Sequence, residues 1–357
     1  MTPSIQARLA RAPWIQVLWS GFLVFGLLAG AEYALRIPRI FDLLPLPRPY
    51  YTYDVSRRLQ HLERLLDERG RLDVLFIGSS VVRADISPTV FDAVASQKIG
   101  HPVVSFNGGF SKMYPTGAVL YVENLWLPRT RPRLIIHGVR EAELASQQHA
   151  PYYLKHGRLE SLWMSDDPWD RLEAKLVGTV HLLQYRGALA KIVSRLADGG
   201  AVNVRERGEM VTDARGYRTE PGSLTRSRGR GKRNWRYDSP PKPGRYGRGF
   251  PAIEHIQALC KKAGIEYILV HLPEHPTRFQ TSVGPAVWTD YKDRIRAFAA
   301  QHDIPYVDVT DGDLSVFGHA RFFSDFHHMR PEGTKLFSTM LAERIVERLA
   351  AMDRAKH

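Results

Sequence analysis

Two adjacent serines are the first place where the sequence offers chemistry. Ser79 and Ser80 follow Gly78 at the end of the apolar run 74–77, which is rich in β-forming residues. That pattern predicts a buried parallel strand ending in a tight turn, and ligands of open α/β sheets bind at such strand ends. An ordinary strand-to-helix turn with serine as the helix N-cap explains the same residues.

A carboxylate and an imidazole lie three residues apart near the other end of the chain, at Asp325 and His328. A serine hydroxyl becomes a nucleophile when an imidazole takes its proton and a carboxylate fixes the tautomer of that imidazole. Ser80, Asp325 and His328 supply these groups in the chain order Ser, Asp, His. We therefore predict them as the catalytic residues.

Five apolar segments predict the strands that would position these groups. They span 72–77, 102–106, 133–137, 266–271 and 304–309, with helical stretches at about 87–97, 115–126, 250–263, 287–302 and 334–351. Apolar strands separated by helices are typical of a parallel sheet that is covered on both faces. The prediction is an α/β fold, a flavodoxin-like three-layer sandwich, with the ends of the first three strands along one edge.

A long interruption, about 145–249, separates the third and fourth strands. Its first half predicts a helix over 169–197, which could be a lid, a docking helix or a plain packing helix. Its second half, 226–248, is rich in glycine, proline and arginine and sets nine basic residues against the single acid Asp238. This composition predicts a flexible loop, and the alternative is an electrostatic clamp for an acidic glycan or lipid headgroups.

An uncharged run of 20 residues, 12–31, lies near the N-terminus. It is long enough to span a hydrocarbon core, and Trp14 and Trp19 suit the membrane interface. A cleaved signal peptide is the alternative, because the small residues 29–31 could be cut. An uncleaved anchor is preferred, since the run is longer than the apolar part of a typical signal peptide.

The charges flanking this run weakly favour a cytoplasmic N-terminus, since Arg8 and Arg11 face no acidic residue on that side. The predicted organisation is therefore a cytoplasmic tail (1–11), a transmembrane anchor (12–35), a tether and helix (36–70) and a domain (71–357) with the insertion at about 145–249. This describes a single-pass protein of the inner membrane whose main domain is extracytoplasmic.

The formal net charge of +13 favours anionic partners such as a membrane or an acidic glycan. No helix-turn-helix, zinc-finger or RNA-binding signature accompanies the charge, so nucleic acid is not expected as a partner. His137, His271 and His275 with Glu274 do not have the spacing of a zinc site, and neither a metal nor a cofactor is predicted.

The chain resembles the SGNH (GDSL-like) hydrolase superfamily, in particular membrane-anchored members whose first block reads Gly-Ser-Ser. The resemblance covers about 75–345, apart from the insertion. Residues 78–80 match the first block with the nucleophile at Ser80, and residues 325–328 match the final Asp-x-x-His block. Residues 107–109, Asn-Gly-Gly, are similar to the second block, whose glycine amide helps to form the oxyanion hole.

The third block, normally Gly-x-Asn-Asp, falls on residues 138–141, Gly-Val-Arg-Glu, and lacks the asparagine. The resemblance implies oxyanion donors at the Ser80 and Gly109 amides. Arg140 could replace the asparagine, since a guanidinium offers several N–H groups and a positive charge, or it could bind a substrate carboxylate. Further candidates for substrate binding are Ser79, Asn107 and His271.

Two functions follow as expectations. The resemblance implies an extracytoplasmic serine acyltransferase or esterase that adds acyl groups, most simply acetyl, to an acidic or neutral envelope polysaccharide or removes them. It also implies a multi-spanning, acyl-exporting membrane protein as a partner. The alternative is a catalytically silent SGNH-like subunit that binds the glycan or assists assembly, favoured by the missing asparagine.

Overall fold

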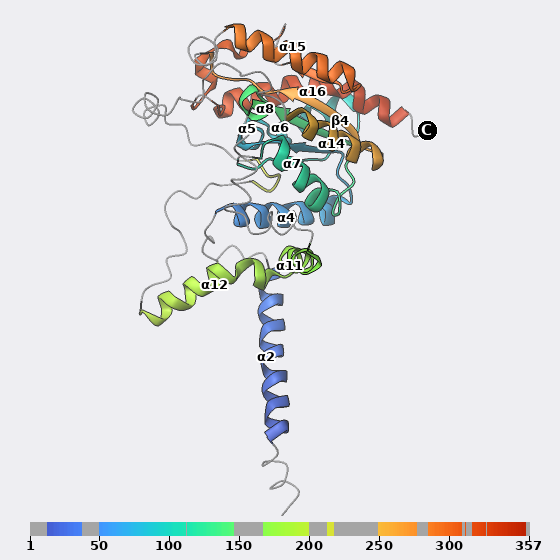
Figure 1. Ribbon diagram of the computed structural model, residues 1–357. Helices are drawn as coiled ribbons and strands as arrows, with labels where there is room; N and C mark the ends of the chain where they lie inside the picture. The colour runs from blue at the N-terminus through green and yellow to red at the C-terminus, as the bar shows by residue number, and fades with distance from the viewer. Residues whose placement is uncertain are drawn as a thin grey trace, which may run out of the picture. The chain divides into compact units, whose positions relative to one another are not determined.

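The computed structural model describes residues 13–37, 50–111, 113–145, 167–199, 213–217, 249–276, 285–308, 311, 316–325 and 327–354 (Figure 1). Internal contacts divide the chain into two units. One comprises 54–160 and 210–357 and contains the sheet, and the other comprises 1–53 and 161–209. The basic stretch 226–248 and the proline-rich tether at 38–49 lie outside the described residues.

Five parallel strands form one sheet in the order β2-β1-β3-β4-β5. They are β1 (Val74–Ile77), β2 (Ser105–Asn107), β3 (Leu134–Val139), β4 (Glu266–His271) and β5 (Tyr306–Asp308). This strand order is that of flavodoxin-like sheets, whose ligands bind outside the carboxyl ends of the strands. The predicted α/β fold is confirmed, with some strands shorter than their apolar segments.

Helices cover both faces of this sheet. In chain order, the described helices of the sheet unit are α4 (Tyr50–Arg69), α5 (Ser80–Asp85), α6 (Pro88–Ile99), α7 (Pro115–Tyr121) with a π-helical turn (Val122–Trp126), α8 (Glu141–Ala145), α14 (Gly249–Lys262), α15 (Pro285–Gln301), a 3-10 turn (Ala320–Phe322) and α16 (Pro331–Arg354). α6 and α16 pack together over the face where Phe76, Ile136 and Ile268 join one core. α14 and α15 cover the other face, where His271 of β4 contacts Trp288 of α15.

The helix before the sheet lies within the segment 36–70, for which a tether and a helix are predicted. It is α4, which begins at Tyr50. Its Arg58 is fully buried and donates hydrogen bonds to the backbone oxygens of Asn107 (2.6 Å) and Gly216 (2.7 Å). Arg58 therefore fastens both α4 and the segment 213–217 to the end of β2.

The other unit contains α2 (Pro13–Arg36), α11 (Pro168–Thr179) and α12 (His181–Ala197). Residues 14–36 are long and apolar enough to cross a membrane, a test that a signal sequence near an N-terminus also passes. The single helix predicted over 169–197 is wrong, because the chain is extended at Val180 (φ −99°, ψ 112°). The adjacent β-branched residues Thr179 and Val180 lower the helical preference at this break.

Candidate active site

A glycine turn places the serines at the carboxyl end of β1. Gly78 has a φ of +141°, and a Cβ there would lie 2.5 Å from Val82 Cγ2 and 2.7 Å from the carbonyl oxygen of Gly138. Only glycine fits such a turn, which lets α5 start directly after the strand. Ser79 is the N-cap of α5 and its Oγ accepts a hydrogen bond from the Val81 amide (3.2 Å), while Ser80 is the first helical residue.

The segment before α16 brings the imidazole to this serine. His328 Nε2 lies 3.0 Å from Ser80 Oγ, and His328 Nδ1 lies 2.8 Å from Asp325 Oδ2. An ionised carboxylate can only accept a hydrogen bond, so Nδ1 carries the proton and Nε2 is left to accept from the hydroxyl of Ser80. The structure thus brings together the three residues predicted as catalytic.

Asp325 orients the imidazole of His328 and also holds the backbone of its own segment. Its Oδ1 accepts hydrogen bonds from the backbone amides of His327 (2.7 Å) and His328 (2.8 Å). Burial raises the pKa of Asp325, but the hydrogen bonds and charge of His328 and these amides outweigh burial and hold the pKa below its usual range. Because the pKa of Asp325 is lower in the folded than in the unfolded chain, its ionised carboxylate stabilises the folded state. This stabilisation is fully present above the unfolded pKa of about 3.9 and is lost as the pH falls through the folded pKa.

Buried hydrogen bonds join α5 to the histidine segment. Asp85 Oδ1, at the end of α5, accepts from the Met329 amide (2.8 Å), and Thr334 Oγ1 donates to the carbonyl oxygen of Ala84 (3.1 Å). These contacts connect residues far apart in the sequence. They hold the nucleophile and the imidazole at a fixed separation.

Asn107 has a different role from the predicted one. It is fully buried, its Nδ2 donates to the carbonyl oxygens of Val82 and Ile86 (2.8 Å each), and its Oδ1 accepts from the Gly109 amide (3.0 Å). Asn107 therefore positions α5 and has no surface for substrate. The Gly109 amide, predicted as an oxyanion donor, is already engaged in this structure.

Arg140 also departs from its predicted role. Its guanidinium is buried, and its Nε donates a hydrogen bond to Glu143 Oε1 (2.9 Å). Its Nη1 donates to His327 Nδ1 (2.9 Å) and lies 3.7 Å from Glu274 Oε1. Ser79 Oγ donates to the same Glu143 oxygen (2.6 Å). Because these groups bind one another in the interior, the structure supports neither an oxyanion role for Arg140 nor substrate binding by Ser79.

Arg140 and Glu143 shift each other's pKa values. Burial raises the pKa of Glu143, although Arg140 opposes that effect. Burial alone would lower the pKa of Arg140, but Glu143 and Glu274 outweigh it and raise the pKa above its usual range. The guanidinium is therefore a permanent cation that compensates buried carboxyl groups.

Arg140→Ala is expected to destabilise the fold by about 3–5 kcal/mol, because it leaves its buried carboxyl partners without their cation. Urea unfolding of the variant measures this loss. Arg131→Ala is the matched control: Arg131 is exposed, and its loss should change the free energy of unfolding by less than about 0.5 kcal/mol. A stable Arg140→Ala variant with a reduced kcat would instead restore the oxyanion role.

The remaining predicted binding residue, His271, is also buried. Its Nδ1 lies 3.2 Å from the Tyr291 hydroxyl, and burial lowers its pKa. His137 similarly lies 2.6 Å from the Tyr267 hydroxyl. Within the described part of the chain, no group of three or more His, Cys, Asp or Glu could hold a metal ion. His271 therefore belongs to the core beside β4, and its assignment to substrate binding is corrected.

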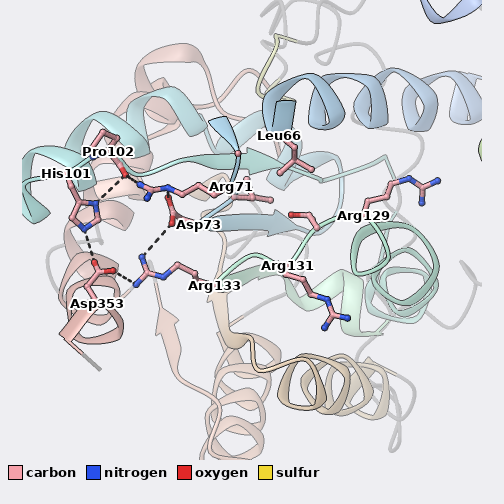
Figure 2. A pocket seen from close by; sticks show the side chains of 12 residues that line it. Leu66, Arg71, Asp73, His101, Pro102, Arg129, Arg131, Arg133 and Asp353 are labelled. Atoms are coloured by element: carbon pink, nitrogen blue, oxygen red, sulfur yellow. Dashed lines mark hydrogen bonds and ion pairs between the residues drawn. The ribbon is translucent and has the colours of Figure 1, made fainter. Parts of the chain in front are cut away.

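A cavity of about 790 Å3 lies at the opposite edge of the sheet, at the amino ends of the strands (Figure 2). Its lining includes the charged residues Arg71, Asp73, Arg129, Arg131, Arg133 and Asp353, together with His101. Several of them pair with one another: Arg133 Nη2 lies 2.6 Å from Asp353 Oδ1, and Arg71 Nε lies 3.4 Å from Asp73 Oδ2. The Arg133–Asp353 pair joins the end of α16 to the start of β3, and Arg133 Nη1 also lies 3.6 Å from Asp73 Oδ1 at the start of β1, away from the serine.

No curated protein matches the chain, and one family model matches residues 249–350, from α14 into α16. Among solved structures it is similar to a putative acylhydrolase from Bacteroides fragilis (12% identity, TM-score 0.38, covering 81% of this chain and 97% of that one). It is also similar to a lipase/acylhydrolase from Enterococcus faecalis (11% identity, TM-score 0.39, covering 78% of this chain and 97% of that one). A third similar structure is an acetyl xylan esterase (9% identity, TM-score 0.37, covering 78% of this chain and 99% of that one). Identities and TM-scores this low do not indicate what the chain does, and its activity is inferred from the geometry of the site.

Proposed function

We propose that the chain is a serine-dependent acyl hydrolase or acyltransferase of the SGNH type. The observation that carries this proposal is the continuous hydrogen-bonded series from Ser80 Oγ through His328 to Asp325 at the carboxyl edge of the sheet. A side-chain series of this kind is the arrangement that activates a serine hydroxyl for attack on an acyl carbonyl.

The chemistry follows from the three positions. His328 Nε2 takes the proton as Ser80 Oγ bonds to the acyl carbon, and Asp325 stabilises the imidazolium that forms. Collapse of the tetrahedral intermediate breaks the bond to the alcohol, which receives the proton from His328. A water molecule or a sugar hydroxyl then attacks the acyl-serine, and His328 takes that proton and returns it to Ser80.

The oxyanion needs donors that point at the reacting carbonyl. The Ser80 amide lies in the first turn of α5, where backbone N–H groups have no partner within the helix. Gly109 and Arg140 are engaged elsewhere, and each missing donor lowers the rate by on the order of 10² to 10³. We therefore expect a slow enzyme unless substrate binding releases one of these groups.

The substrate and the location are the finer part of the proposal. α2 is the candidate anchor, and we place the sheet unit outside the cytoplasm, with a single inner-membrane span and the N-terminus inside. The proposed substrate is an O-acylated, most simply O-acetylated, envelope polysaccharide, and the proposed partner is a multi-spanning protein that exports the acyl group. The resemblance of the Gly-Ser-Ser block to membrane-anchored SGNH proteins and the net charge of +13 support this assignment.

The test uses the full chain in detergent with a chromogenic acetyl ester, alone and with an added polysaccharide. Wild-type protein should release the chromophore and, with an acceptor, attach acetyl groups that mass spectrometry detects on the glycan. Ser80→Ala should do neither. Glycan binding without ester turnover by the wild-type chain would contradict the proposal and favour the silent binding subunit.

A further inference from the structure

Two helices of the N-terminal unit expose apolar side chains in rows. On α11, Trp169 is 73% exposed, and Leu172 and Leu176 follow on the same helical face. On α12, Val193 is 66% and Leu196 is 61% exposed. Rows of exposed apolar residues mark surfaces that meet a partner or a membrane.

The end of the apolar helix α2 fixes where α12 begins. Glu32 Oε1 accepts a hydrogen bond from the His181 amide (3.1 Å), and Glu32 Oε2 accepts from the Leu182 amide (2.9 Å). Arg36 Nη2 donates to the same Glu32 carboxylate (3.0 Å). Glu32 immediately follows the uncharged run 12–31. The first turn of α12 is therefore bound at the point where α2 stops being apolar.

The orientation of these helices follows from the same contacts. α12 packs against α2 and against α11. Figure 1 shows α12 leaving the end of α2 across the direction of the α2 axis. If α2 runs along the membrane normal, α12 lies along the membrane plane, at the depth where the hydrocarbon core ends.

The composition of α12 suits that depth. Its sequence contains three Lys or Arg residues and no Asp or Glu. Helices that combine an apolar face with basic residues bind in the interface between headgroups and acyl chains, and anionic lipids strengthen their binding.

We propose that α11 and α12 form an interfacial helix pair whose exposed apolar rows insert into the leaflet from which α2 emerges. The proposal rests on the proposed role of α2 as a membrane anchor. A lipid surface is favoured over a protein partner because Glu32 ties α12 to the end of the span and because α12 carries only basic charges. Such a pair would give the chain a second membrane contact besides the anchor.

Site-directed nitroxide labelling of the full chain tests the inference. Cys260 is the only cysteine and is buried, so Cys260→Ala provides a background for single cysteines. Leu172→Cys and Leu196→Cys report on the apolar rows, with Arg171→Cys and Ser194→Cys as controls at other exposed positions of the same helices. Each labelled chain is reconstituted in vesicles of phosphatidylcholine and phosphatidylglycerol, and a circular dichroism spectrum like that of the unlabelled chain confirms that it is folded.

The readout compares collisions with oxygen, which partitions into lipid, and with a water-soluble nickel chelate. The ratio of oxygen to nickel collisions should be several-fold higher at Leu172 and Leu196 than at their controls. Equal ratios, or labels shielded from both reagents as in a protein contact, would overturn the inference. A label at Phe22 in α2 distinguishes failure of the helix pair from failure of the anchor. If the label at Phe22 lies in lipid and the label at Leu172 lies in water, only the interfacial helix pair is refuted. If the label at Phe22 also lies in water, the membrane anchor is refuted as well.

Discussion

Ser80→Ala should abolish turnover of an acyl ester, with kcat reduced by on the order of 10⁴ to 10⁶. The substitution removes the hydroxyl that lies 3.0 Å from His328 Nε2 and leaves the imidazole without a nucleophile to activate. The fold should persist, because the N-cap of α5 is Ser79 and not Ser80. Steady-state kinetics with a chromogenic acetyl ester, together with thermal unfolding of both proteins, measures the effect.

Ser79→Ala is the matched control for this result. It removes a hydroxyl that caps α5 and binds Glu143, so the chain should lose about 1 kcal/mol of stability. The Ser80 hydroxyl remains beside His328, and turnover should persist. If Ser79→Ala were inactive and Ser80→Ala active, the assignment of the nucleophile would be wrong by one residue.

Asp325→Asn should reduce kcat by on the order of 10⁴ without preventing folding. The asparagine can still accept hydrogen bonds from the His327 and His328 amides, so the segment should keep its shape. Its uncharged amide no longer stabilises the imidazolium, and its NH2 group favours the wrong tautomer of His328.

Asp290→Asn is the matched control. The side chains of Asp290 and Asp325 are both 40% exposed, and among the contacts described Asp290 pairs only with Arg294 of the same helix. Kinetics across a range of pH should show normal turnover for Asp290→Asn and the full loss for Asp325→Asn at every pH. An Asp325→Asn variant with more than about a tenth of the wild-type kcat would remove Asp325 from the catalytic series.

The sheet could be predicted from the sequence because its strands are buried on both faces and read as short apolar runs. The strand ends then placed the first serine turn at the ligand-binding edge. Asp325 and His328 could be named because their spacing lets one short turn hold both groups. Bringing them to Ser80 needed only the parallel topology that the pattern implied.

The supporting residues could not be found in this way. Glu143 and Glu274 compensate Arg140, but they are separated by more than a hundred residues and carry no periodic signal that would link them. The second-block resemblance led to Asn107 and Gly109 as substrate or oxyanion groups. In the fold, the Asn107 side-chain amide donates to the carbonyl oxygens of Val82 in α5 and Ile86 at its end, a contact that depends on how closely β2 approaches α5.

Helix limits were another source of error. The predicted helix over 169–197 has continuous apolar spacing, but the start of α12 depends on Glu32, which is 149 residues from His181. In the segment predicted as a tether and helix, 36–70, α4 begins at Tyr50 and its Arg58 donates to backbone oxygens of distant segments. Such tertiary contacts carry no signal in the local sequence.

The most direct test of the catalytic assignment is the intact mass of the full chain after incubation with a fluorophosphonate, which reacts covalently with activated serines. We expect a single adduct that peptide mapping places on Ser80, absent from Ser80→Ala and formed much more slowly by Asp325→Asn. An unmodified wild-type chain, or an adduct on a residue other than Ser80, would contradict the account that Ser80, His328 and Asp325 form a working nucleophilic site.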